Sequence, residues 1–294
     1  MIRYRLFLLL DTVLMALPKS WRKGLFTTLA ALARHLAPKR NRVIQQNLSF
    51  AFGDSLSSSQ REGIERYCYR NLALNFLQVM ENRRNSADEL AKRVTFENRE
   101  YVDHILSTGK GTIFVSAHFG NWELGAAALS SLVTPTTAIY KGFDRPEFDP
   151  YLLEARSRHR MEMAEKSGAL KYLTRTLKNG GCVSLMIDQA SNARHGVAVD
   201  FFGHKTYHSS TPATLSFKYE APIIPLYIFT SDEKHYTIRF GEPIKVNGDD
   251  TASIREATQK QVDTLERAIR ERPELWFWCH KRWKGEFPEI YRKE

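Results

Sequence analysis

The sequence predicts an α/β fold in which helices flank a mixed, largely parallel sheet. From about residue 94 onward, short apolar runs rich in β-branched residues alternate with longer stretches of helical periodicity. Hydrophobic residues make up 43% of the 294, which is ample for one packed core. Folds of this class place their sites where strands end, at the carboxyl edge of the sheet. The expected strands cover residues 94–97, 112–117, 136–140, 183–187, 223–229 and 236–240.

Residues 1–40 predict membrane-associating helices ahead of a single domain over residues 41–294. The apolar run of residues 6–17 contains Asp11 and stops at Pro18, so it is shorter than the roughly 20 apolar residues of a spanning helix. We favour a helix that dips into one leaflet of the membrane. A short tilted span, a buried first helix and a signal peptide are the alternatives.

Leucines at helical spacing over residues 25–36 predict an amphipathic second helix that ends near Pro38. This helix either extends the membrane-facing surface or packs on the domain. Capping boxes at residues 59–62 and 86–89 predict the starts of two further helices.

The net charge of +10 gathers at one end of the chain. Before Asp54, nine basic residues stand against a single acid, Asp11, so eight of the ten net charges lie around the apolar run. No basic region is interleaved with stacking aromatics, which disfavours nucleic-acid binding. A membrane surface with anionic lipids is therefore the expected partner.

The motifs that would indicate a metal or nucleotide site are incomplete. Three cysteines lie far apart without CxxC spacing, so they indicate neither a disulfide framework nor a zinc site and suit a reducing compartment. His204 and His208 lack the glutamate of a zinc-binding H-E-x-x-H helix. Residues 108–112 lack the first glycine of a phosphate-binding loop. We expect no metal site.

The most informative stretch is residues 115–123, where an imidazole and a carboxylate follow a strand. His118 and Glu123 are five residues apart, and on a continuous helix this spacing would point them roughly 140° from each other. A turn at Gly120, before a helix that opens at Glu123 and continues to residue 132, would let them meet. An imidazole held by a carboxylate through one nitrogen is a general base that can activate a hydroxyl. A structural histidine at a strand end is the alternative.

The stretch from His118 to Glu123 resembles the H-x4-D/E signature of glycerolipid and lipid A acyltransferases, most closely that of the bacterial lipid A late acyltransferases. Two departures from the family pattern are Lys141, where an arginine is expected, and threonine in place of glycine at Thr211. A lysine lacks the guanidinium fork, so acceptor geometry is in question. Further motifs in that family's order occur at residues 47–52, 139–141, 156–158, 168–169, 177–180, 188–189, 201–203, 222–225 and 273–284.

The resemblance implies an acyltransferase at the cytoplasmic face of the cell inner membrane. It would move a fatty acyl chain from acyl carrier protein to a hydroxyl of a 3-hydroxyacyl chain on a lipid A precursor, without a cofactor. His118 would be the base, and Glu123 would hold its tautomer and stabilise the imidazolium. Substrate contacts are expected from Asn121, Lys141, Arg156, Arg158, Asp188 and Gln189.

Other interpretations of these residues stay open. Arg156 and Arg158 could lie on a solvated helix face, and residues 188–189 could cap a loop. The acceptor could instead be a lysophospholipid, glycerol phosphate or a phosphatidylinositol mannoside. The His-Glu pair could activate water in a thioesterase, or the basic N-terminus could belong to a membrane scaffold without activity. The aromatic cluster at residues 276–283 fits either a lipid channel or the core.

Overall fold

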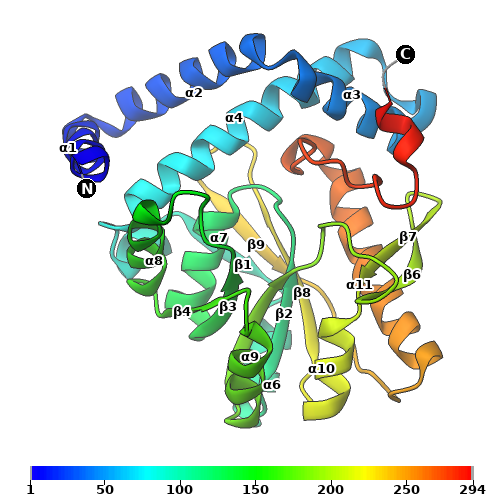
Figure 1. Ribbon diagram of the computed structural model, residues 1–294. Coiled ribbons are helices and arrows are strands. Elements are labelled where there is room, and N and C mark those ends of the chain that lie inside the picture. The colour runs from blue at the N-terminus through cyan, green and yellow to red at the C-terminus, as the bar shows by residue number, and fades with distance from the viewer. Residues whose placement is uncertain (1, 293–294) are drawn as a thin grey trace.

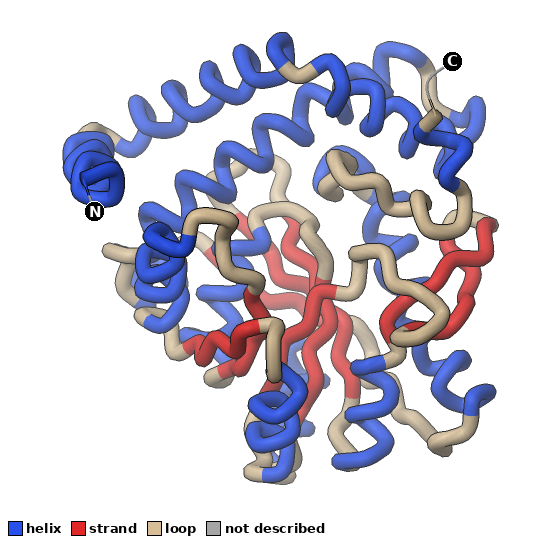
Figure 2. The backbone as a smooth tube through the Cα atoms, in the orientation of Figure 1, coloured by secondary structure: helices blue, strands red, loops and turns tan. Residues whose placement is uncertain are grey.

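The computed structural model describes residues 2–292, in which helices cover both faces of a mixed sheet (Figures 1 and 2). The strands of the described chain are β1 (Val94–Glu97), β2 (Thr112–Ser116), β3 (Thr136–Tyr140), β4 (Met161–Glu165), β5 (Cys182–Met186), β6 (Gly196–Phe201), β7 (His204–Ser209), β8 (Ile223–Phe229) and β9 (Tyr236–Phe240). Seven of them form one sheet in the order β1-β9-β8-β2-β5-β3-β4, while β6 and β7 form a separate hairpin. Only β1 and β9 run against the other five strands of that sheet. The predicted α/β class with a largely parallel sheet is confirmed.

The long helix α4 runs across the carboxyl edge of the sheet, with α2 packed along it (Figure 1). The helices are α1 (Ile2–Ala16), α2 (Lys19–Leu36), α3 (Pro38–Phe52), α4 (Ser58–Asn82), α5 (Ala87–Ala91), α6 (Arg99–Ser107), α7 (Trp122–Ala128), α8 (Asp149–Ser157), α9 (Ala169–Lys178), α10 (Thr211–Tyr219) and α11 (Thr251–Glu271). Helix α4 begins with a capping box between Ser57 and Gln60, two residues before the predicted one. The box predicted at Ser86 and Glu89 is confirmed.

The core lies on both faces of β2. Ile113 and Val115 belong to the larger apolar cluster, with side chains of α9, α10 and α11. Phe114 points the other way, into a second cluster with side chains of α6 and α7. A strand covered on both faces has no polar side to alternate with, which is why this sequence reads as a continuous apolar run.

The predicted strands are confirmed to within one residue at each end, but β4, β6 and β7 were not predicted. Strand β4 reads Met-Glu-Met-Ala-Glu and sits at the sheet edge, where its glutamates stay in solvent. The alternative that Arg156 and Arg158 lie on one solvated helix face is therefore wrong, because α8 ends at Ser157 and β4 follows. The helix predicted to reach residue 132 is α-helical only as far as Ala128. A π-helical turn over Leu129–Val133 follows it directly.

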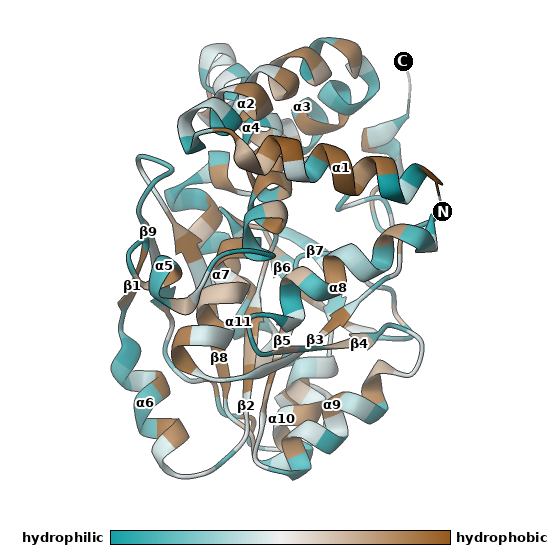
Figure 3. Ribbon diagram, turned by 90° about the vertical axis from the view of Figure 1, so that its left-hand side faces the viewer, coloured by the Kyte–Doolittle hydropathy of each residue, from teal (hydrophilic) through white to brown (hydrophobic). Residues whose placement is uncertain are grey.

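The N-terminal helices α1 and α2 meet at Pro18 and leave large apolar side chains in solvent. Figure 3 shows how many residues of α1 are hydrophobic. No helix between residues 2 and 292 combines the length and the apolar character that crossing a bilayer requires. The exposed N-terminal apolar residues are Ile2, Leu6, Leu9, Leu10 and Val13 on α1, with Trp21, Leu25, Leu29, Leu32 and Leu36 on α2.

Candidate active site

His118 lies two residues beyond the end of β2, at the carboxyl edge of the sheet. The chain then turns at Gly120, whose φ of 58° lies in the left-handed region. A Cβ at this position would stand 2.1 Å from the carbonyl oxygen of Ile228, so only glycine fits. Asn121 caps the next helix, because its side chain accepts a hydrogen bond from the Leu124 amide at 3.0 Å.

Asp188 is the carboxylate that holds the imidazole of His118. The parallel register places Ser116 beside Met186, so the ends of β2 and β5 are neighbours. One carboxylate oxygen, Oδ1, lies 3.0 Å from Nδ1 of His118. The other, Oδ2, accepts hydrogen bonds from the His118 amide at 3.0 Å and from the Trp276 indole at 3.1 Å. Asp188 is fully buried, and these donors replace its lost hydration.

Glu123 does not occupy the predicted place beside the imidazole. It lies in the first turn of α7 and forms an ion pair with Arg156 of α8, with Nη2 2.7 Å from Oε1 and Nε 3.3 Å from Oε2. Between residues 2 and 292 there is no hydrogen bond from Glu123 to His118. The predicted carboxylate partner of the His118 imidazole is therefore corrected from Glu123 to Asp188. After the turn at Gly120, α7 is oriented so that the Glu123 side chain lies beside α8.

The charges around His118 favour the protonated form of its imidazole. Burial lowers the pKa of His118, but the charge and hydrogen bond of Asp188 outweigh burial and raise that pKa above its ordinary value. The charge of Glu123 also raises the His118 pKa, whereas the charge of Arg156 lowers it. Burial raises the pKa of Asp188, yet the charge and hydrogen bonds of His118 bring it below its usual range. Asp188 thus stays ionised at neutral pH.

A row of buried amides on α4 supports the turn between β2 and α7. Asn71 and Asn75 donate from Nδ2 to the Gly120 carbonyl at 2.9 and 3.0 Å. Asn75 also accepts the Glu123 amide at 3.2 Å, and Asn82 donates to the Glu123 carbonyl at 3.1 Å. This row was not predicted from the sequence. Its signal was the helical spacing of the amides at positions 71, 75, 78 and 82, among the apolar residues of the same stretch.

The C-terminal segment, which packs on α4, also holds the turn around His118. The Phe277 amide donates to the His118 carbonyl at 3.0 Å, and the Gly120 amide donates to the Leu275 carbonyl at 2.8 Å. The rings of Trp122 and Phe277 flank the imidazole, with centroids 5.3 and 6.2 Å away. In the aromatic cluster, three tryptophans and an arginine prove to be core residues: Trp276, Trp278, Trp283 and Arg282.

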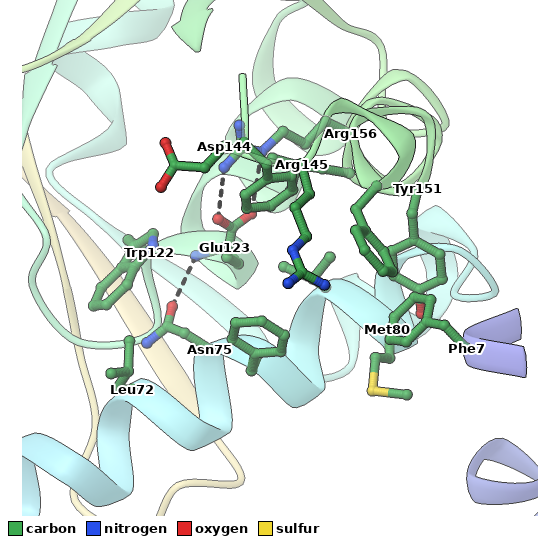
Figure 4. Close-up of a pocket in the computed structure, with 15 residues that line it drawn as sticks. Phe7, Leu72, Asn75, Met80, Trp122, Glu123, Asp144, Arg145, Tyr151 and Arg156 are labelled. Carbon is green, nitrogen blue, oxygen red and sulfur yellow. Dashed lines mark hydrogen bonds and ion pairs between the residues drawn. The ribbon is translucent and has the colours of Figure 1, made fainter. Parts of the chain in front are cut away.

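A cavity of about 630 Å³ lies next to this site (Figure 4). Trp122 connects the two, because its ring contacts His118 and also lines the cavity. The Glu123–Arg156 ion pair forms the polar end of an otherwise largely apolar wall. The remaining lining residues are Phe7, Leu72, Asn75, Phe76, Val79, Met80, Phe143, Asp144, Arg145, Phe148, Tyr151 and Leu152.

The other predicted substrate residues are not gathered around the imidazole. Lys141 and Gln189 follow β3 and β5 at the same edge of the sheet, and both side chains are exposed. Arg158 is exposed as well, and its Nε donates to the carbonyl of Asn85 at 3.3 Å, beyond the end of α4. Asn121 is buried and engaged in capping α7.

This arrangement would allow the imidazole to act as a general base. Because Nδ1 faces a buried carboxylate, the imidazole keeps its proton there when neutral and offers Nε2 as the acceptor. No hydrogen bond reaches Nε2 from residues 2–292, and the side chain is 24% exposed, so a substrate proton has access. In the part of the chain that the structure describes, no group of three or more His, Cys, Asp or Glu side chains is arranged to hold a metal ion.

Comparison with known proteins places the chain in a family. Lipid A biosynthesis acyltransferase 2 of Shigella flexneri is 22% identical over 269 residues, which are 90% of this chain and 84% of that protein. Lipid A biosynthesis lauroyltransferase of Escherichia coli (strain K12) is 22% identical over 260 residues, or 87% and 83% of the two chains. Phosphatidylinositol mannoside acyltransferase of Mycolicibacterium smegmatis is 24% identical over 198 residues, or 65% and 64%. The sequence-family model of the bacterial lipid A biosynthesis acyltransferases matches residues 2–285, and the chain belongs to that family.

Proposed function

We propose that this protein moves a fatty acyl chain from acyl carrier protein to a hydroxyl of a 3-hydroxyacyl chain on a lipid A precursor. The proposed place of the reaction is the cytoplasmic face of the inner membrane. Family membership supports the lipid acceptor and the transfer chemistry. The observation that carries the mechanism is the His118–Asp188 pair beside a largely apolar cavity.

In this scheme, His118 transfers one proton. Its Nε2 takes the proton of the acceptor hydroxyl while the hydroxyl oxygen attacks the carbonyl carbon of the thioester. The tetrahedral intermediate then collapses, the C–S bond breaks, and the imidazolium returns the proton to the leaving thiolate. The products are an ester and the free thiol of the carrier, so the scheme uses neither an acyl-enzyme nor a cofactor. Asp188 stabilises the imidazolium throughout, because its carboxylate faces Nδ1.

Glu123 and Arg156 serve the substrate side of the site. Arg156 uses Nε and Nη2 for Glu123, which leaves Nη1 without a hydrogen bond within residues 2–292. A guanidinium held in this way is suited to a phosphate of the acceptor or of the carrier's phosphopantetheine. Glu123 thereby positions Arg156 and acts on His118 through its charge.

The cavity is the proposed site of the fatty chain. Val79 and Met80 line it from α4, and Trp122 lies between it and the imidazole. Val79→Trp would shorten the space available to an acyl chain. We expect this variant to prefer a shorter donor than the wild type, as measured by competition between acyl carrier proteins of different chain length.

Membrane attachment through α1 and α2 is the proposed role of the N-terminus. The exposed N-terminal apolar residues would enter one leaflet, and the exposed basic residues Arg3, Arg5 and Lys19 would face its anionic headgroups. This arrangement would bring the acceptor to the cavity from the membrane surface, because Phe7 of α1 lines the cavity.

The function is tested with the full-length protein in detergent. The protein is given an acyl donor on acyl carrier protein or coenzyme A, together with one acceptor, and the products are identified by mass spectrometry. We expect transfer to the lipid A precursor from acyl carrier protein, and no transfer by His118→Ala, whose folding is checked by circular dichroism. Preferred acylation of a lysophospholipid or a phosphatidylinositol mannoside would contradict the proposed acceptor. Release of free fatty acid at a rate independent of the acceptor would identify a thioesterase instead.

A further inference from the structure

A second hollow lies across α4 from the cavity just described. It measures about 610 Å³ and is enclosed by α2, by α4 and by the turn between β8 and β9. We call it the α2–α4 pocket. Its lining residues are Lys19, Ser20, Lys23, Gly24, Thr27, Arg70, Leu74, Leu77, Gln78, Glu81, Arg93, Asn121, Glu233, Lys234, His235 and Tyr236.

The lining of the α2–α4 pocket carries an excess of positive charge, with five lysines and arginines against two carboxylates. Glu233 is neutralised twice over, by Lys23 at 2.8 Å and by Arg70 at 2.6 Å. Lys19 and Lys234 are exposed and form no ion pair within residues 2–292. Lys19 and Lys234 are therefore available to bind an anionic ligand.

The start of α2 adds a second requirement for an anion. Pro18 precedes the helix and provides no side-chain cap, and the first turn contains no acid. The backbone hydrogen bonds of this turn begin at Trp21, so the amides of Lys19 and Ser20 have no backbone partner among the described residues. A lysine at a helix start opposes the helix dipole, and a bound anion would offset both unfavourable features.

Exposed apolar side chains lie on the same helix, outside the lining of the pocket. Trp21 is 68% exposed and Leu25 is 38% exposed, on the helix that contributes Lys19 and Lys23 to the lining. Tryptophan is the residue type that settles at the headgroup level of a membrane. Under the proposed attachment through α1 and α2, the pocket would open where lipid phosphates lie.

We propose that the α2–α4 pocket binds the phosphate of an anionic lipid headgroup, with Lys19 and Lys234 as its free cations. This inference rests on the proposed membrane attachment and adds a specific headgroup site to it. The pocket extends to Asn121, which caps α7 and so belongs to the turn that carries His118. A headgroup bound there holds α2 on α4 beside the active site.

The test compares two double variants with the same change in net charge. Lys19→Glu/Lys234→Glu reverses the free cations of the pocket. Lys178→Glu/Lys218→Glu is the control, at the ends of α9 and α10, far from α2 in Figure 1. Partition onto vesicles is measured for phosphatidylcholine alone and for phosphatidylcholine mixed with phosphatidylglycerol. The pocket variant should lose at least about tenfold of the affinity that phosphatidylglycerol adds, while the control keeps most of it. Equal losses in the two variants would mean a general charge effect and would overturn the proposal.

A bilayer-free measurement separates the pocket from the proposed attachment. Short-chain phosphatidylglycerol, dispersed in water, is titrated into the full-length protein and followed by calorimetry. Binding by the wild type that the pocket variant loses supports the pocket even if vesicle binding fails, in which case the attachment alone is contradicted. Unchanged binding by the pocket variant overturns the pocket.

The phosphate could come from the acceptor instead of from a membrane phospholipid. Activity in neutral detergent is therefore measured with the phosphorylated acceptor and with its dephosphorylated form. A raised KM of the pocket variant for the phosphorylated acceptor alone assigns the site to the acceptor's phosphate. Unchanged KM values together with lost phosphatidylglycerol binding assign it to the membrane lipid.

Discussion

Asp11 accepts a hydrogen bond from the hydroxyl of Tyr151 at 2.6 Å, although it lies in the apolar helix α1. The Asp11 carboxylate is 1% exposed and also pairs with Arg83 at 3.0 Å and with Arg84 at 2.6 Å. The ring of Phe7, one turn away, packs against Tyr151 with centroids 4.8 Å apart. The acid in the apolar run is thus neutralised inside the protein, and it fastens α1 to the wall of the cavity.

Replacing Asp11 should therefore detach α1. Asp11→Ala leaves Arg83 and Arg84 without this partner, and we expect a loss of about 2 kcal/mol of docking free energy, because both arginines reach solvent. Hydrogen exchange should accelerate in the α1 amides, and acyl transfer should fall with it. Thr12→Ala on the exposed side of α1 is the control. Unchanged exchange in Asp11→Ala would contradict this role.

Asp188→Asn should move the acid limb of the pH profile. In the wild type, the His118 pKa is raised above its ordinary value, so kcat/KM should fall as the pH drops through this raised pKa and the base becomes protonated. Without the carboxylate, burial dominates and lowers the pKa, so the limb moves to lower pH. The maximal rate should also drop by about 100-fold, because the imidazolium loses its partner. Asp200→Asn, at an exposed position on β6, is the control. An acid limb at the same pH in Asp188→Asn and in the wild type would refute the effect of Asp188 on the His118 pKa.

Glu123→Gln should have a weaker effect than Asp188→Asn on the same profile. Glu123 raises the His118 pKa through its charge alone, so the limb should move to lower pH by a smaller step. Arg156 loses its ion partner, and the KM for the lipid acceptor should rise about tenfold. The measurement is a pH series of kcat and KM for both variants. A larger pH shift in Glu123→Gln than in Asp188→Asn would restore Glu123 as the partner of the imidazole.

Gly120→Ala should disrupt the turn that carries His118. The new Cβ would collide with the Ile228 carbonyl, in a backbone conformation with φ of 58° that alanine rarely adopts. We expect a loss of at least about 3 kcal/mol in the free energy of unfolding. Gly168→Ala isolates the backbone strain, because φ there is 86° and nothing lies within 4 Å of the added Cβ. Its cost should be about 1 kcal/mol by chemical denaturation. Equal costs for the two variants would contradict a steric role for Ile228.

The fold was largely accessible from the sequence, because buried parallel strands have no polar face and appear as continuous apolar runs. β2 and β8 are of this kind, and their predicted bounds agree closely with the structure. β4 escaped prediction because an edge strand with two exposed glutamates has no such run. Its pairing with β3 supplies the hydrogen bonds that hold it in the extended conformation.

The sequence alone determined that His118 closely follows a strand, that a glycine turn comes next and that the first apolar run is shorter than an ordinary spanning helix, since these depend on local order and composition. Only the tertiary structure decided which carboxylate faces the imidazole. Asp188 is 70 residues from His118 in the chain, but the parallel register of β2 and β5 brings their ends together. Glu123 is closer to His118 in sequence, but it pairs with Arg156. Its position in the first turn of α7 directs its side chain away from His118.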